Sequence, residues 1–564
     1  PPVSGMGERV TRKHATGWIS VPADTPSTPV SLHIGKVKLS QTHPTPGSPM
    51  TGMRVAAETD DPTSVRKQAT RKRSSSPVGP PPDGKRHSRQ EIRAFSIQIE
   101  GIWDYVRRRT PISVHCGGRP LPIAGHGMFL TPAINGRNTP QDLRQRLDEG
   151  FVLTQLGEFR LSKLHDTEWQ ERVIALYERT RQVVKDKFGY DVFVTYGTLL
   201  GLVREGGYIG HDCDFDAAYV SNFRTGPEAA AELVEISLAL LEAGFPVDLR
   251  QRVLHVHDPE DPEQNIDLFH TFFDEEDQLR FPWGVAGTSK LTRAEMSGTH
   301  EGHLPGGAVL VPNNEEAFVA HLYGDDWRLP KPGFRWALER TDVADDAVLT
   351  IEQRSHVYWA GFYARHGYAK GSSFFEYVAS RPEVPSTVID LGCGEGRDSW
   401  AFAAAGRTVI GLDQSEVGIA RAAGRASDEG LGDRATFQAC DVADREALDA
   451  TLAGVIAGST GPVLFYLRFF LHAIRPDVQD GLMEAICRHS RPGDMFAAEF
   501  RTDKDEDKAK THGNHYRRFQ PAAEFRESLI DRWGFEVLDE IEDTGLSPYG
   551  DEDPALYRVL GRRI

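Results

Sequence analysis

The chain contains 564 residues, of which 39% are hydrophobic and 26% are charged, and its 65 basic and 82 acidic residues give a formal net charge of −17. This length predicts several domains rather than one core. The acidic balance excludes a general basic nucleic-acid-binding protein, so we expect no specific nucleic-acid partner.

Two further features indicate the compartment. No apolar run approaches the ~18 residues that a transmembrane helix needs, and the first residues contain no apolar segment behind a basic one. Five cysteines are scattered without a C-x-x-C pair, which argues against a disulfide framework and a structural zinc site. We therefore expect a cytoplasmic protein without a transmembrane segment.

Residues 1–91 are rich in Pro, Ser and Thr and carry basic runs at 71–73 and 85–86. With few large apolar side chains they bury too little surface to offset chain entropy, which predicts a disordered basic tail. A solvated tail is the favoured interpretation, and a targeting or nucleic-acid role of the basic runs is the alternative. Residues 92–160 are predicted to be a small region of unknown role, in which 95–99 alternate like a half-buried strand.

Residues 161–345 form the next predicted domain. Apolar residues at helical spacing over 169–188 end at Gly189, which suits a left-handed helix cap, and a second helix is expected over 228–242. A Pro-rich stretch at 330–332 precedes a linker that we place near 340–350.

The strongest chemical signal of this domain is a cluster of carboxylates. In a strand, residues two apart share a face, so Asp212, Asp214 and Asp216 are expected to project the same way. A divalent cation among them would relieve their repulsion, and hard oxygen ligands suit Mg²⁺ or Mn²⁺. Asp267, in another strand-like run, is expected to complete this metal site. Upstream, a helix predicted to open at Gly197 offers free N–H groups for a phosphate.

Several of these residues have alternative interpretations. Arg204 is either a phosphate clamp, since a guanidinium binds phosphate oxygens in a bidentate way, or an ordinary surface arginine. The aspartates are alternatively an acidic loop that binds calcium or no ion. His211 and Cys213 alternate to the opposite face of the expected strand, so packing is the better interpretation for both.

This segment resembles the LicD family and the related fukutin-type enzymes. The resemblance covers residues 165–335 and rests on Arg-Glu-Gly-Gly at 204–207, the aspartate cluster, Asp267, and Leu-Tyr-Gly-Asp-Asp-Trp at 322–327. It implies a nucleotidyltransferase-like α+β fold and the transfer of a phospho-alcohol, such as phosphocholine or ribitol phosphate, from a CDP-linked donor to a sugar hydroxyl. It also implies that Asp214 and Asp216 hold the metal with Asp267. The sequence departs from the family pattern at 210–211 and at 213.

The last part of the chain, residues 346–564, alternates short apolar runs with helical segments. The runs lie at 388–391, 409–413, 435–440, 463–466 and 495–500. This alternation predicts a doubly wound α/β domain with a parallel sheet. Two later runs, at 535–538 and 556–560, are expected to add a closing antiparallel hairpin.

The first of these strands runs into a glycine-rich turn that contains Gly392, Gly394 and Gly396. Glycines let the backbone approach a ligand closely. A nicotinamide-binding fingerprint is the alternative, but its spacing is G-x-G-x-x-G, whereas this turn reads G-x-G-x-G.

Three acids accompany the turn. Asp390 lies in the strand before it and is placed to accept hydrogen bonds from the amino-acid part of a cofactor, directly or through water. Asp413 ends the next strand and is placed to accept both ribose hydroxyls. Asp441 ends a third strand and is placed near the adenine edge.

This set of residues resembles class I S-adenosylmethionine-dependent methyltransferases over 352–564. The resemblance implies a Rossmann-like seven-stranded fold with S-adenosyl-L-methionine as cofactor, and it includes the aromatic segment around Trp359, where related enzymes close over the cofactor. Arg468 and His472 follow the fourth strand, and their spacing predicts a shared helix face. His472 is the candidate proton acceptor for the methylated group. A basic segment at 512–518 is either an anion-binding element or a solvated loop.

Together these features predict an α/β multidomain, bifunctional enzyme of surface glycan modification. One activity would transfer a phospho-alcohol from a CDP-linked donor to a glycan or sugar acceptor, and the other would methylate the product or a related precursor. The alternatives are a nucleotidyltransferase that modifies a small molecule, and a methyltransferase with a non-catalytic LicD-like scaffold. The donor alcohol, acceptor sugar, methylated atom and oligomeric state are not predicted by the sequence.

Overall fold

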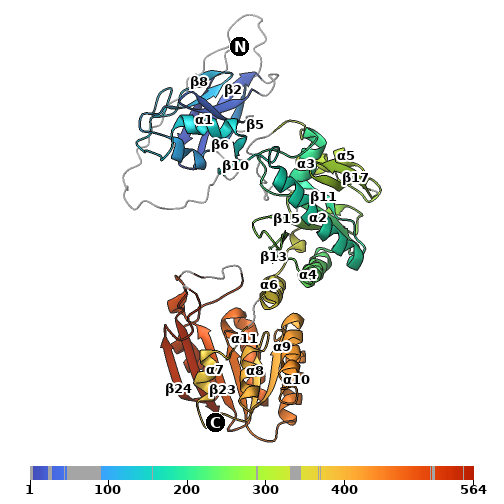
Figure 1. The fold of residues 1–564 in the computed structure, drawn as a ribbon, viewed down its shortest axis with the longest axis vertical. Helices are drawn as coiled ribbons and strands as arrows, with labels where there is room; N and C mark the ends of the chain where they lie inside the picture. Colours follow the sequence, from blue (N-terminus) through green and yellow to red (C-terminus); the bar gives the residue numbers. More distant parts are fainter. Residues whose placement is uncertain are drawn as a thin grey trace, which may run out of the picture. The chain divides into compact units, whose positions relative to one another are not determined.

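The computed structural model describes residues 4–22, 28–42, 45–46, 90–154, 157–287, 290–296, 298–330, 344–365, 368, 370–508, 510, 515–550 and 552–564 (Figure 1). The chain divides into two compact units. One comprises Pro1–Ala175, Phe193–Asp216 and Gly284–Asp342, and the other comprises Leu176–Val192, Ala217–Trp283 and Val343–Ile564. The linker expected near 340–350 lies partly outside the described residues.

Two antiparallel four-stranded sheets form the N-terminal part, in the orders β1-β2-β6-β5 and β4-β3-β7-β8. Alternate residues of β2 are buried, and Ile19 and Val21 share one core with Leu32 and Val114. The elements of this part are β1 Ser4–Val10, β2 His14–Pro22, β3 Val30–Ile34, β4 Val37–Thr42, β5 Thr45–Pro46, β6 Gln90–Gln98, β7 Ile112–Cys116, β8 Arg119–Leu121, α1 Pro140–Asp148, β9 Phe151–Leu153 and β10 Phe159–Leu161.

The expectation of a disordered tail over 1–91 is therefore wrong for the strands within it. The composition of residues 1–91 is an average over two unlike parts, the strands β1–β4 and residues 47–89, and the latter lie outside the described residues. The local signal is the period-2 burial over 14–22, which a composition argument does not detect. The strand expected over 95–99 is confirmed as β6, and the region 92–160 packs into the same core as β2 and β3.

The middle of the chain contains a six-stranded sheet in the order β11-β12-β15-β14-β13, with β16 paired to β15. Both predicted helices are present as α2 and α4, and Gly189 adopts the expected positive φ of 80° after α2. The elements are α2 Thr167–Phe188, β11 Phe193–Val194, α3 Tyr196–Glu205, β12 Asp216–Ser221, α4 Gly226–Glu242, β13 Val247–Leu249, β14 Leu254–His257, β15 Asn265–Phe273, β16 Leu279–Arg280, β17 Thr299–Leu304, β18 Gly307–Pro312 and α5 Glu315–Tyr323.

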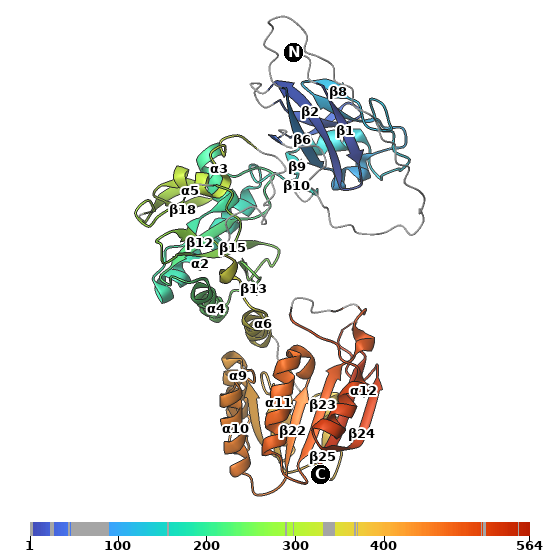
Figure 2. The ribbon, with the colours of Figure 1, turned by 180° about the vertical axis from the view of Figure 1, so that it is seen from behind.

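Seven strands form the C-terminal sheet, in the order β21-β20-β19-β22-β23-β25-β24 (Figure 2). The first five are parallel, and β25 runs antiparallel to β23 and β24, so the predicted strand runs and closing hairpin are confirmed. The strands are β19 Thr387–Leu391, β20 Thr408–Asp413, β21 Ala435–Ala439, β22 Val463–Arg468, β23 Met495–Arg501, β24 Phe535–Asp543 and β25 Leu556–Arg563.

Helices cover both faces of this sheet (Figures 1 and 2). Ile389 packs in one core with Leu482 of α11, while its neighbour Val388 packs in a second core with Phe402 of α8. Successive strand residues point to opposite faces, so the two cores lie on the two sides of the sheet. The helices are α6 Ile351–Arg365, α7 Ser373–Ala379, α8 Arg397–Ala404, α9 Glu416–Asp428, α10 Arg445–Ala457, α11 Pro476–His489 and α12 Ala522–Glu527.

In open sheets of this kind, ligands bind beyond the carboxyl ends of the parallel strands, which here lead into the loops after β19, β20, β21 and β22. Among the described helices, none combines the length and the hydrophobicity that crossing a membrane requires.

Candidate functional site

The loop between β19 and α8 depends on its three glycines. Gly392, Gly394 and Gly396 have φ angles of 77°, 56° and 75°, a conformation that side chains other than glycine rarely adopt. A Cβ on Gly392 would lie 2.3 Å from Cδ2 of Phe470, and one on Gly394 would lie 2.6 Å from Cε1 of Tyr363. The loop therefore has both the backbone geometry and the close packing that only glycine permits.

Asp413, at the end of β20, is held by this loop. The N–H of Gly394 donates to its Oδ2 at 2.8 Å, and the N–H of Ser415 donates to its Oδ1 at 2.9 Å. Burial raises the pKa of Asp413 to about 6, while these two hydrogen bonds act in the opposite direction. A carboxylate oxygen has a second lone pair, so each oxygen can still accept a ligand hydroxyl.

Asp390 lies near the end of β19, directly before the glycine loop, as expected. Its side chain is buried and accepts a hydrogen bond from Oγ of Ser399 at 2.5 Å, and burial raises its pKa to about 7. It is absent from the walls of the two cavities described below. The expected contact of Asp390 with a cofactor, directly or through water, stays a prediction; in the structure its carboxyl accepts the hydroxyl of Ser399 in the first turn of α8.

Two adjoining cavities open beside the loop. The larger, about 700 Å³, is lined by Gly392, Gly394 and Asp413 and also by Trp359 of α6. The smaller, about 70 Å³, shares Gly392 and Asp413 with the larger and is lined in addition by Asp441, which follows β21. The other candidate residues of this domain thus line two neighbouring cavities that share part of their walls, whereas Asp390 and Gly396 line neither.

Arg468 and His472 also line the larger cavity, but they do not share a helix. Arg468 ends β22, Phe469 takes a left-handed φ of 53°, and His472 lies in the 3-10 helix Leu471–Ala473. The predicted helix face is therefore wrong, because the chain turns sharply at Phe469. Strained residues of this kind cluster at functional sites.

The environment of Arg468 is acidic and that of His472 is basic. Nε of Arg468 lies 3.3 Å from Glu499 and 3.8 Å from Asp398, both of which are buried. Burial and the charges of Arg501 and Arg517 hold the pKa of His472 well below its usual value. A neutral His472 is therefore expected near neutral pH.

The basic segment at 512–518 is described only in part, because His512 lies outside the described residues. His515 and Arg517 line the larger cavity, and Tyr516 lines the smaller one. Arg518 instead donates to the carbonyl oxygens of Leu471 and Ile474, so its role is to hold the 3-10 helix.

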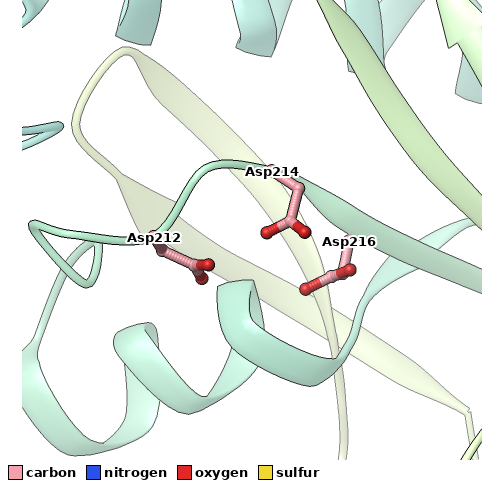
Figure 3. Close-up of side chains that lie close together, drawn as sticks. All are labelled: Asp212, Asp214 and Asp216. Carbon is pink, nitrogen blue, oxygen red and sulfur yellow. The ribbon is translucent and has the colours of Figure 1, made fainter. Parts of the chain in front are cut away.

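A second site lies in the middle of the chain, where oxygens of Asp212, Asp214 and Asp216 lie within 4.8 Å of one another. Figure 3 shows the three side chains turned toward a common space. Only Asp216 belongs to a strand, so the expected alternation along one strand is wrong, although the carboxylates converge. His211 and Cys213 are not part of this cluster.

The start of α3 fixes Asp216. The N–H of Gly197 donates to its Oδ2 at 2.8 Å, and its own N–H donates to Oγ1 of Thr198 at 2.8 Å. A Cβ on Gly197 would lie 2.3 Å from Oδ2 of Asp212, so glycine is needed for the carboxylates to approach the helix. The predicted helix opening at Gly197 is confirmed, and its positive end faces the aspartates.

Lys163 is a member of this site that the sequence reasoning missed. Its ammonium group is buried, donates to the carbonyl oxygen of Asp214 and lies 4.1 Å from the ring centroid of Trp169. Burial and the charge of Asp214 raise the pKa of Asp212 to about 7, while Lys163 acts to lower it. No spacing pattern links residue 163 to a cluster about fifty residues later, so only the fold shows the contact.

Asp267 and Arg204 each have partners outside the three-aspartate cluster. Asp267 is not part of the three-aspartate cluster: it faces His255 across the β14–β15 pair, 3.7 Å from Nε2, and accepts a hydrogen bond from Asn265. Arg204 lies in the last turn of α3, about 10 Å along the helix axis from Gly197, and pairs with Glu205 at 2.7 Å. The strand expected around Asp267 is confirmed as β15, while its part in a metal site stays a prediction, as does the phosphate-clamp role of Arg204.

Comparison with known proteins concerns the C-terminal part. Residues 383–466 match the family model for a methyltransferase domain. A segment of 111 residues, 20% of this chain, is 30% identical to the 2-heptyl-1-hydroxyquinolin-4(1H)-one methyltransferase of Mycobacteroides abscessus. That segment spans 44% of the relative's length, so the chain covers less than half of it.

Solved structures similar to this chain include the glycopeptide N-methyltransferase MtfA, at 18% identity over 35% of this chain and 97% of that one, with a TM-score of 0.28. A methyltransferase from Anabaena variabilis is 16% identical over 37% of this chain and 93% of that one, with a TM-score of 0.29. The residues that match the methyltransferase-domain model lie within the α/β domain built on the seven-stranded sheet.

Proposed function

We propose that this domain is an S-adenosylmethionine-dependent methyltransferase. The observation that carries the proposal is Asp413, which accepts the N–H groups of Gly394 and Ser415 and lines the larger cavity beside the glycine loop. Asp413 would bind the ribose hydroxyls, and Asp441 would face the adenine from the smaller cavity. The cofactor would supply a methyl group on a sulfonium centre.

Calorimetric titration with S-adenosylhomocysteine tests this proposal. One bound molecule per chain is the expected result, because the two cavities share Gly392 and Asp413 in their walls. Absence of binding would remove the proposal.

A substitution in the glycine loop should weaken cofactor binding. In Gly394→Ala the new methyl group would meet the ring of Tyr363 and the residue would keep a positive φ. We expect S-adenosylhomocysteine affinity to fall by at least about tenfold, measured by calorimetry. Gly424→Ala, where a Cβ meets nothing within 4 Å, is the control and should bind normally.

The decrease of cofactor affinity at low pH should reflect protonation of Asp413. A ribose hydroxyl donates best to the ionised carboxylate, so binding favours the deprotonated form of a group whose pKa is about 6. Affinity is then full above pH 6 and falls as the pH decreases, by about tenfold per unit below it. Dissociation constants measured across this range check the expectation; a profile that stays flat down to about pH 5 contradicts it.

We further propose that the middle of the chain transfers a phospho-alcohol from a CDP-linked donor to a sugar hydroxyl. Three features support this proposal: the convergent aspartates, the N-terminus of α3 beside them and the nearby ammonium of Lys163. Mg²⁺ or Mn²⁺ would be held by Asp212, Asp214 and Asp216, whose oxygens are the hard donors that these ions prefer. The metal would neutralise the diphosphate and acidify the acceptor hydroxyl.

Product analysis distinguishes this activity from its alternatives. Incubation with CDP-choline, CDP-ribitol or CDP-glycerol and a sugar acceptor should release CMP. Release of pyrophosphate from a nucleoside triphosphate would instead support a nucleotidyltransferase, and no turnover with a normal metal titration would support a scaffold.

The two activities in one chain suggest a shared pathway of surface glycan modification, in which the methyl group is placed on the transferred phospho-alcohol or on the decorated sugar. Labelled methyl donor added to the coupled reaction tests this. Label found only in protein would exclude it.

A further inference from the structure

We propose that the methyltransferase site takes a planar oxygen acid as acceptor and methylates its oxyanion, which Nε2–H of His472 and the guanidinium of Arg517 would stabilise. The inference rests on the proposed methyltransferase function and names the substrate class of that same site. It is carried by the hydrogen bonding of His472, the charges around it and the aromatic walls of the cavity.

The hydrogen bonding of His472 fixes its tautomer. The backbone N–H of Arg501 donates to Nδ1 at 3.2 Å, so Nδ1 is an acceptor and the neutral ring carries its proton on Nε2. His472 lines the larger cavity, and among the described residues no side chain or carbonyl bonds to Nε2. The group that His472 offers to an acceptor is therefore an N–H donor, not the base that the sequence suggested.

The surrounding charges favour an anion. The groups that act on His472 are Arg501 of β23 and His515, Arg517 and Arg518 of the following segment. Arg501 pairs with Asp505 and Glu552, and Lys510 also lies 3.2 Å from Asp505. Arg501, Arg517, His515 and Arg518 all act to lower the pKa of His472, so the electrostatic field at His472 opposes its protonation and favours a bound anion.

The cavity walls fit a flat molecule. Tyr358 stacks on His515 with ring centroids 4.5 Å apart, and Trp359 lies 5.1 Å from the same ring. Phe469, whose left-handed backbone directs it from the end of β22, lines the cavity together with these rings. Aromatic surfaces of this kind favour planar ligands through stacking.

The proposed step balances without a further reactant. The acceptor loses its proton to solvent on binding, a lone pair of its oxyanion forms the new O–CH₃ bond, and the S–CH₃ bond breaks with its electron pair passing to sulfur. The products are a methyl ether and the neutral thioether of the spent cofactor. Enols, phenols and N-hydroxy heterocycles are oxygen acids that can ionise in this way.

Binding of 4-nitrophenol to the complex with S-adenosylhomocysteine tests the inference, because the phenolate has its own visible absorption band. We expect the bound probe to titrate at least about one unit lower than the free probe. An unchanged or raised pKa, or no binding, would overturn the inference. Cofactor binding is measured first by calorimetry, so failure of the methyltransferase proposal is recognised separately.

Two variants of His472 distinguish a donor from a base. The oxygen of His472→Asn can replace Nδ1 but offers no N–H toward the cavity, whereas the longer amide of His472→Gln places an N–H near the former Nε2. We expect the affinity for the phenolate to fall about tenfold in His472→Asn and less than about threefold in His472→Gln. Arg488→Gln, on the exposed face of α11, is the control and should bind as the wild type does. Equal affinities in both variants and the wild type would overturn the role of His472.

Discussion

Replacing Asp413 by Ala should weaken S-adenosylhomocysteine binding by about 100-fold, because two hydrogen bonds to a charged group are lost together. The same carboxylate holds the N–H groups of Gly394 and Ser415, so the loop also loses its anchor at the end of β20. Calorimetry measures the affinity, and thermal unfolding measures the structural cost. The affinity loss should exceed what the loss of stability explains.

Asp413→Asn provides the matched comparison. Its carbonyl oxygen can accept one of the two backbone N–H groups, so the loop is better preserved while the negative charge is removed. We expect an intermediate loss of about tenfold and no decrease of affinity near pH 6. Asp433→Asn, exposed before β21, should bind as the wild type does. Normal affinity in Asp413→Ala would remove the ribose assignment.

A further prediction concerns Asp390, which lies in β19 directly before the glycine loop. Because Asp390 is buried against Ser399 and has a pKa raised to about 7, Asp390→Asn is expected to keep the hydrogen bond and most of the cofactor affinity. Asp390→Ala would leave Ser399 without its acceptor and cost about 1–3 kcal/mol of stability. Thermal unfolding and calorimetry check both variants; loss of cofactor affinity in Asp390→Asn would instead support a contact between Asp390 and the cofactor.

The C-terminal fold could be predicted from the sequence because its signals are local. Each parallel strand is a short apolar run, and the glycine turn and Asp413 follow strand ends, where the sheet topology brings loops together. The exception is His472: its spacing from Arg468 suggested a helix, but the left-handed backbone of Phe469 turns the chain. Its tautomer depends on an N–H from Arg501, which no sequence pattern reports.

The middle site was predictable only in part. The run containing Asp214 and Asp216 is local, and so is the glycine that lets α3 begin beside them. The positions of Lys163 and Asp267 depend on long-range packing and strand register. Lys163 contacts Asp214 although no sequence pattern links the two residues, and Asp267 pairs with His255. A shift of one residue in the strand register moves a side chain to the opposite face of the sheet, and the sequence alone does not fix that register.

Asp214→Asn should have opposite effects on metal binding and on the metal-free protein. Three carboxylates with oxygens within 4.8 Å of one another repel, and Lys163 supplies one positive charge against them. Neutralising Asp214 removes the neighbour that helps to raise the pKa of Asp212, so this pKa should fall from about 7 toward its usual value. Less repulsion should also stabilise the metal-free protein by about 1 kcal/mol.

Metal affinity should move the other way. We expect Mn²⁺ to bind the wild type and to raise its unfolding temperature, and we expect Asp214→Asn to bind at least about tenfold more weakly because one hard ligand has lost its charge. Asp148→Asn, in the exposed last turn of α1, is the charge-matched control and should respond to Mn²⁺ as the wild type does. If the wild type shows no Mn²⁺ response, Lys163 alone balances the cluster and the phosphotransferase proposal is lost, while the methyltransferase proposal is unaffected.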